Sequence, residues 1–166
     1  MFETFSTYAR QVVFLARFKA GRRGANAIGV DDFAVALILE DQGMIGTVVA
    51  EMIYGDQELG PTLPPEDHSS FLPAEIAFDL LTKIEGSLPQ SEATPLSTET
   101  PISSELERVC DAAKNLQYKF QLSQIEPLHL LAAVLTEESS QFTRLLREVG
   151  ITYDQVLQRL RTATKD

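Results

Sequence analysis

The chain carries one pattern of apolar positions twice, and this internal repeat limits its fold more than any other sequence feature. The two halves align without a gap at an offset of 97 residues over about fifty positions. Val12 then aligns with Val109, and Ala16 aligns with Ala113. Identity between the halves is low, so the shared pattern of apolar positions carries the inference. Because each half is small for independent stability, we expect both to pack together as one pseudo-symmetric domain.

Within each half the apolar residues recur at the spacing of α-helices. In the first half the pattern predicts four helices, at residues 7–23, from the pair Asp31-Asp32 to near Gly43, at 44–53, and at 73–85. In the second half it predicts a helix with the capping-box spacing Ser104-x-x-Glu107, then helices that open at Glu126-Pro127, run from Phe142 to Val149, and start at Thr152. The predicted fold is therefore all-α, with two pseudo-symmetric four-helix repeats and about eight helices.

Two segments break this periodic pattern. Residues 54–72 combine Gly, Pro and acidic residues, which predicts an exposed insertion loop. Residues 87–101 mix Ser, Thr and Pro without an aromatic residue, which predicts a linker with little apolar surface to bury. We therefore assign the first repeat to residues 1–86 and the second to residues 102–166.

The net charge of −10 is unevenly distributed. Residues 1–30 carry five basic side chains and one acid, whereas residues 31–100 carry fourteen acids and one base. Such an acidic chain is a poor candidate for bulk nucleic-acid binding, so we do not expect nucleic acid as a partner. The basic side chains near the end of the first helix are expected on a solvated face, with an anion contact as the alternative; they are Arg17, Lys19, Arg22 and Arg23.

Several classes of protein are excluded by what the sequence lacks. The longest apolar run, residues 33–39, is far shorter than the roughly 20 residues of a membrane span. The first residues do not resemble a signal peptide, and the single Cys110 cannot form an internal disulfide, so we expect a cytoplasmic protein without a membrane partner. Cys110 is predicted to be buried, and His129 to be a packed structural residue.

No motif of a known catalytic class is present. The sequence contains no G-x-S-x-G elbow, no H-E-x-x-H pair and no Gly-Lys dipeptide, so it has no Walker A loop to hold phosphates. One Cys and two distant His residues do not make a zinc site. We therefore expect that the protein is not an enzyme and needs neither a cofactor nor a metal.

Two stretches of the sequence carry a resemblance to a known family. The first is Met1-Phe2-x-x-Phe5-Ser6-x-x-Ala9-Arg10-x-Val12-Val13-x-x-Ala16 with the later Gly24-x-x-x-Ile28-Gly29, and the second is Ile125-Glu126-Pro127-Leu128-His129-Leu130. Together they resemble the N-terminal domain of Clp-type AAA+ unfoldases, the second stretch being similar to the disaggregase branch. The resemblance covers residues 2–53 and 102–162. It implies an all-α domain of two four-helix repeats that docks adaptors and protein substrates and passes them to an ATPase ring, whose modules these 166 residues do not contain.

The resemblance also implies where partners bind. Contacts near the ends of the first helices and between the repeats place recognition near Ser6, Arg10, Asp31 and Ser103. Some members of the family hold phosphorylated arginine with a hydroxyl at the start of the first helix and an acid before the second helix. Here the second acid position is Leu128, so we do not expect phosphoarginine recognition. The two serines and Asp31 are also expected to cap helices.

These observations favour a non-catalytic protein-docking module that binds substrates or adaptors for a Clp-type ATP-dependent unfoldase or protease. One alternative is a stand-alone accessory or regulatory protein of a Clp complex, which the sequence does not separate from the first. A less favoured alternative is an anion-binding or nucleic-acid-binding helical protein that uses the basic first helix. Salt-dependent affinity for DNA would distinguish this last possibility.

Overall fold

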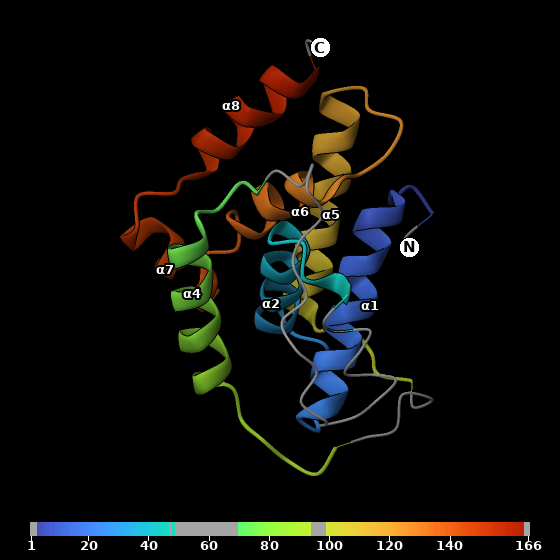
Figure 1. Ribbon diagram of the computed structural model, residues 1–166. Coiled ribbons are helices and arrows are strands. Elements are labelled where there is room, and N and C mark those ends of the chain that lie inside the picture. Colours follow the sequence, from blue (N-terminus) through green and yellow to red (C-terminus); the bar gives the residue numbers. More distant parts are fainter. Residues whose placement is uncertain (1–2, 47, 49–69, 94–98, 165–166) are drawn as a thin grey trace.

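The protein is all-α in the part of the chain that the structure describes. The computed structural model describes residues 3–46, 48, 70–93 and 99–164, and Figure 1 labels its helices. They are α1 (Thr7–Arg22), α2 (Val30–Asp41), α4 (Ala74–Ser87), α5 (Ser104–Lys119), α6 (Pro127–Val134), α7 (Gln141–Glu148) and α8 (Tyr153–Thr164). The predicted fold class is confirmed, with seven helices and no strand in these residues. Most of the helix predicted at 44–53, and most of the insertion at 54–72, lie outside the described residues.

The start of α2 differs from the prediction. The helix begins at Val30 with Gly29 as its N-cap, so Asp31 and Asp32 lie in its first turn instead of preceding it. The Asp32 carboxylate reaches back and accepts the N–H of Gly29 at 2.9 Å. An acid at the third helical position satisfies a free backbone donor as an N-cap side chain would. The prediction that both aspartates precede the helix was therefore wrong.

The starts of α5 and α8 are capped by side chains. The N-cap of α5 is Ser103, whose hydroxyl accepts the N–H of Leu106 at 3.1 Å, so Ser104 is the first helical residue and not a cap. The hydroxyl of Thr152 accepts the N–H of Gln155 at 3.3 Å, as its spacing predicted. Each hydroxyl satisfies a backbone donor that the helix leaves without an intrahelical partner.

The two halves are joined by a short parallel β-bridge that precedes α1. Phe5 pairs with Ile125, which lies between α5 and α6. The N–H of Ser6 donates to the carbonyl of Ile125 at 3.0 Å, and the N–H of Ile125 donates to the carbonyl of Thr4 at 2.8 Å. We call this contact the first junction.

A second junction repeats the same bonds with the halves exchanged. Ile28 pairs with Ile102, the N–H of Ser103 donates to the carbonyl of Ile28 at 2.9 Å, and the N–H of Ile28 donates to the carbonyl of Pro101 at 2.8 Å. The offset of 97 relates the two junctions, because Phe5 is equivalent to Ile102 and Ile28 is equivalent to Ile125. The predicted pseudo-symmetry is thus present in individual backbone hydrogen bonds. The exact repeat boundaries remain a prediction.

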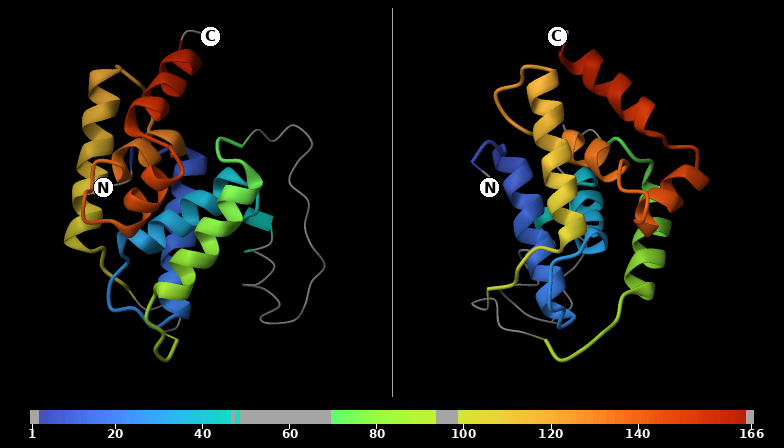
Figure 2. Two further views of the ribbon diagram at one scale, coloured as in Figure 1. Left: turned by 90° about the vertical axis from the view of Figure 1, so that its left-hand side faces the viewer. Right: turned by 180° about the vertical axis from the view of Figure 1, so that it is seen from behind.

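The arrangement of the helices follows from these junctions. α1 and α5 run antiparallel, so the start of each helix lies near the end of the other (Figures 1 and 2). α2 lies in the centre and contacts α1, α4, α5 and α6. Its continuous apolar run, residues 33–39, is buried at every position. A helix surrounded on all sides needs apolar residues on every face, which explains why this run lacks a polar stripe.

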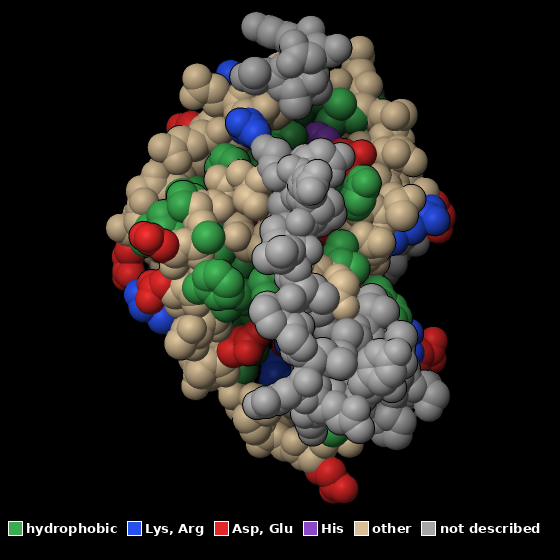
Figure 3. Space-filling view, viewed as in Figure 1, with side chains coloured by type: hydrophobic (Ala, Val, Ile, Leu, Met, Phe, Trp, Pro, Cys, Tyr) green, Lys and Arg blue, Asp and Glu red, His purple; other side chains and the backbone are tan. Residues whose placement is uncertain are grey.

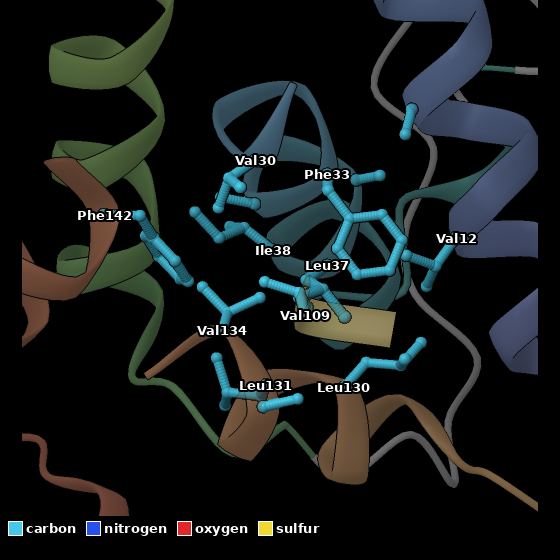
Figure 4. Packing of buried hydrophobic residues seen from close by; sticks show 14 of the residues in the cluster. Val12, Val30, Phe33, Leu37, Ile38, Val109, Leu130, Leu131, Val134 and Phe142 are labelled. Atoms are coloured by element: carbon cyan, nitrogen blue, oxygen red, sulfur yellow. The ribbon is translucent and has the colours of Figure 1, made fainter. Parts of the chain in front are cut away.

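The core draws equivalent residues from both halves. Figure 4 shows their side chains pointing toward one another from α1, α2, α5 and α6. The pairs related by the offset of 97 include Val12 with Val109, Phe33 with Leu130, and Leu37 with Val134. The repeats therefore share one hydrophobic core. None of the described helices is both long and apolar enough to cross a lipid bilayer.

The turn after α1 packs closely against the start of the predicted linker. The N–H of Ser91 donates to the carbonyl of Arg23 at 2.8 Å. Gly24 follows with a φ of +70°, a conformation that suits glycine, and a Cβ there would lie 2.9 Å from the carbonyl carbon of Ser91. The equivalent residue of the second repeat, Gln121, also has a positive φ, of 53°.

Candidate functional site

A side-chain hydrogen bond ties the start of α1 to the start of α6. Ser6 is only 3% exposed, and its hydroxyl accepts the N–H of Ala9 at 3.2 Å. The same hydroxyl donates to Oε2 of Glu126 at 2.8 Å. The predicted cap at Ser6 is confirmed, whereas the bond to Glu126 is a link between the repeats that the sequence did not predict.

An apolar groove of about 250 Å³ lies at this first junction, between the start of α1, the end of α2 and the start of α6. Its apolar lining comes from both repeats and includes Tyr8, Ile38, Phe71, Leu128, Leu131 and Phe142. Ile38 and Phe142 are buried, whereas the Tyr8 side chain is 58% exposed. On the face drawn in Figure 3, hydrophobic side chains reach the surface beside acidic ones. Because the Tyr8 side chain in its lining is exposed, the groove offers apolar contact surface that is open to solvent.

One wall of the groove is fixed by polar contacts to the end of α2. The carboxylate of Asp41 accepts the N–H of Phe71 at 2.7 Å and the N–H of Leu72 at 3.0 Å. The side-chain amide of Gln42 donates to the carbonyl of Leu72 at 2.9 Å and to Asp41 at 2.9 Å. Phe71 and Leu72 both line the groove, although the sequence placed them at the end of an exposed insertion. No local pattern marks them, because their partners lie 30 residues earlier.

The four site residues predicted from the resemblance lie in two groups. Ser6 and the exposed Arg10 are at the first junction, whereas Ser103 and Asp31 are at the second, where Ser103 is bonded to Ile28. The two junctions lie at opposite ends of α1, whose 16 residues span about 24 Å. The structure therefore does not bring the four residues into one cluster.

Asp31 lies in surroundings that disfavour its charged form. The residue is partly buried, and its Oδ1 atom has no hydrogen-bond partner among the described residues. Burial raises the pKa of the Asp31 carboxyl, the nearby Asp32 raises it further, and Arg23 and Arg144 oppose this rise. A carboxyl that loses its charge more readily is a weaker partner for a cationic group than a surface aspartate.

Asp32 forms a buried ion pair with Arg23. Two parallel bonds of 2.7 Å join the guanidinium Nε and Nη2 atoms to the two carboxylate oxygens. The side chain of Asp32 is fully buried, and that of Arg23 is 15% exposed. The bond to Asp32 raises the pKa of the Arg23 guanidinium. Arg23 is therefore a structural partner of α2, and its predicted place on a solvated face was wrong.

The rest of the basic cluster shares its surroundings with acids. Lys19 and Arg22 line a second hollow of about 320 Å³ together with Glu85 and the Arg23–Asp32 pair. The ammonium of Lys19 is 4.0 Å from a carboxylate oxygen of Glu85, and the Arg22 guanidinium lies 5.8 Å from the ring centre of Phe18. Because carboxylates neutralise part of the positive charge, this hollow is a weaker anion site than the sequence suggested.

His129 and Cys110 are structural, as predicted. His129 is 4% exposed, and its Nδ1 atom accepts the N–H of Glu126 at 2.8 Å, which helps to form the first turn of α6. Burial lowers the pKa of His129. Cys110 is 2% exposed, and burial raises its pKa to about 11. Within the described ranges, no three His, Cys, Asp or Glu side chains gather so that they could hold a metal ion.

One family model matches the second half of the chain. Residues 101–166 match the family model described as the Clp repeat (R) N-terminal domain. A search of curated protein sequences finds no significant match.

Solved structures extend the fold likeness to the whole chain. The N-terminal domain of the caseinolytic protease associated chaperone ClpD from Arabidopsis thaliana is 16% identical, with a TM-score of 0.57 over 100% of this chain and 97% of that one. The Hsp104 N-terminal domain from Candida albicans is 20% identical, with a TM-score of 0.56 over 93% of this chain and 87% of that one. A structure from preliminary structural investigations of a malarial protein secretion system is 12% identical, with a TM-score of 0.67 over 96% of this chain and 94% of that one. The predicted resemblance to a Clp N-terminal domain is therefore confirmed.

Proposed function

We propose that this protein is a non-catalytic docking module, because residues 101–166 match the Clp N-terminal repeat model and the chain shares the fold of solved Clp N-terminal domains. It holds a segment of a protein substrate or adaptor in the groove at the first junction. The segment is presented to a Clp-type ATP-dependent unfoldase or protease. We place this docking in the cytoplasm, the compartment expected from the sequence.

The observation that carries the proposal is the groove itself. It is apolar, open to solvent, and built from both repeats, with Tyr8 on α1, Phe71 before α4, and Leu128 on α6. Apolar surface that remains exposed at the meeting point of two structural units is typical of a protein-binding site. Ser6, one of the predicted binding residues, supports this groove indirectly, because it holds Glu126 in the wall.

A stand-alone accessory or regulatory protein of a Clp complex would use the same groove, so this alternative differs in the partner and not in the site. The anion-binding alternative has less support. Arg23 is committed to Asp32, and Glu85 lies beside Lys19. Arg10, Asp31 and Ser103 lack comparable support as contact residues, and of these only Arg10 shares the junction at which the groove lies.

The test compares two exposed tyrosines. Tyr8→Ala removes a groove side chain, whereas Tyr118→Ala removes a more exposed one, at 88%, from α5 outside the groove. The probe is a fluorescein-labelled, uncharged peptide with a Leu-Val-Phe-Leu core and Gly-Ser flanks, and its affinity is measured by fluorescence anisotropy. We expect the wild-type protein and Tyr118→Ala to bind it equally, and Tyr8→Ala to bind at least about fivefold more weakly. Absence of binding, or equal loss in both variants, would refute the proposal.

A further inference from the structure

The charged residues around the groove are mostly acidic. Glu40, Asp41 and Glu126 line it, and Arg159 from α8 is the single basic residue among the described residues that do so. The lining thus combines an apolar floor with an excess of negative charge. This arrangement bears on which protein segment fits, a question that rests on the proposed docking function.

Two of these carboxylates are held in fixed positions. Oε2 of Glu126 accepts the hydroxyl of Ser6 at 2.8 Å, and the carboxylate of Asp41 accepts the N–H groups of Phe71 and Leu72. Both acids are partly buried. A carboxylate that is already positioned loses little side-chain entropy when a cation approaches, and partial burial lowers the screening by water. Arg159, in contrast, is exposed.

The net charge of the whole chain also favours a basic partner. At a net charge of −10 the protein attracts basic segments over long range and repels acidic ones. A second copy of this chain carries the same charge and is disfavoured as the occupant. We propose that the groove selects an extended protein segment in which a Lys or Arg directly flanks a short apolar core.

Three peptides of equal length test this selectivity. They share the Leu-Val-Phe-Leu core and carry two Lys, two Ser or two Glu residues as flanks. We expect affinity to fall in the order Lys, Ser, Glu, with a Lys-to-Glu ratio of about five- to tenfold at 50 mM NaCl. The ratio is expected to shrink at 300 mM NaCl, because salt screens the charges.

Charge-neutralising variants locate the effect. Glu126→Gln keeps an oxygen that can accept the Ser6 hydroxyl, and Glu40→Gln removes a second groove charge. The matched control is Glu107→Gln, which removes one exposed acid near the start of α5, the helix that begins at the second junction. We expect both groove variants to lower the Lys-to-Glu ratio at least twofold and the control to leave it unchanged.

The outcomes separate this inference from the proposed function. If the Ser peptide binds in a Tyr8-dependent way but all three peptides bind equally, the selectivity is wrong and the docking function stands. If Glu107→Gln lowers the ratio as much as Glu126→Gln, the preference comes from net charge and the inference is overturned. If the Ser peptide does not bind, the proposed function fails first.

Discussion

The ion pair between Arg23 and Asp32 allows a quantitative prediction about what holds the first repeat together. The Asp32 side chain is fully buried, with its two oxygens bonded to Arg23 at 2.7 Å and Oδ2 also accepting the N–H of Gly29. Arg23→Ala removes the cation and leaves the carboxylate buried with one backbone donor. Breaking a buried pair in this way costs about 3–5 kcal/mol. If the loss is about 3 kcal/mol, the lower end of this range, we expect the Tm of a chain of this size to fall by roughly 6–12 °C.

The second repeat supplies the matched control. Arg108 makes the same bidentate contact with Glu137, at 3.0 Å for both bonds, but its side chain is 58% exposed. Arg108 lies at the surface, and Glu137, whose side chain is 12% exposed, keeps the hydrogen bond from the Ser139 hydroxyl after truncation. Arg108→Ala is therefore expected to cost clearly less stability than Arg23→Ala. Urea unfolding followed by circular dichroism at 222 nm measures both values. Equal losses in the two variants would show that burial does not govern the strength of these pairs.

A double substitution tests the reason for the loss. The residues equivalent to Arg23 and Asp32 in the second repeat are Phe120 and His129, an uncharged combination in a similar backbone setting. Replacing a buried ion pair as a unit is commonly far less costly than removing one partner. We therefore expect Arg23→Phe with Asp32→His to be more stable than Arg23→Ala by at least about 1 kcal/mol. A double variant no better than the single one would contradict this.

Three further predictions concern single positions. Gly24→Ala places a side chain at φ +70° against the linker backbone and should lower stability by more than about 1 kcal/mol. Gly86→Ala adds a side chain in open space within α4 and should raise stability by a few tenths to about 1 kcal/mol. Equal urea midpoints for the two variants would refute this. Cys110 should react with Ellman's reagent only after unfolding, because burial raises its pKa to about 11, and rapid native labelling would contradict that. Burial lowers the pKa of His129 from 6.5, so the stability it contributes is complete above pH 6.5 and is lost as pH falls through the folded pKa. His129→Asn should therefore lose less Tm between pH 7 and pH 5 than the wild-type protein, and an equal loss would place the titration elsewhere.

Local sequence signals predicted the fold because helices depend on nearby residues. The stripe at helical spacing and Ser6 located α1 to within one residue, and Thr152 located α8. The offset of 97 predicted one pseudo-symmetric domain, and the backbone hydrogen bonds of the two junctions, which the sequence did not predict, repeat at that offset. Asp32 was misplaced because an acid can serve a helix start from inside the first turn as well as from before it.

Local sequence signals did not predict the candidate groove, because its key contacts join residues far apart in sequence. Ser6 and Glu126 are separated by 120 residues, and Asp41 and Phe71 by 30. Periodicity reports which face of a helix is buried, but not which side chains meet across helices. The buried pair of Arg23 and Asp32 left one trace, since both positions change together to uncharged residues in the second repeat.

The central claim, that the groove at the first junction docks a protein segment, is tested most directly by intermolecular nuclear Overhauser effects. The ¹⁵N,¹³C-labelled protein is saturated with the unlabelled, uncharged Leu-Val-Phe-Leu peptide. The account predicts cross-peaks from the peptide methyl groups to the Tyr8 and Phe71 rings and to the Leu128 methyl groups, which line the groove from three separate segments. Cross-peaks confined to the hollow near Lys19 and Arg22, or none from groove residues at saturation, would contradict it.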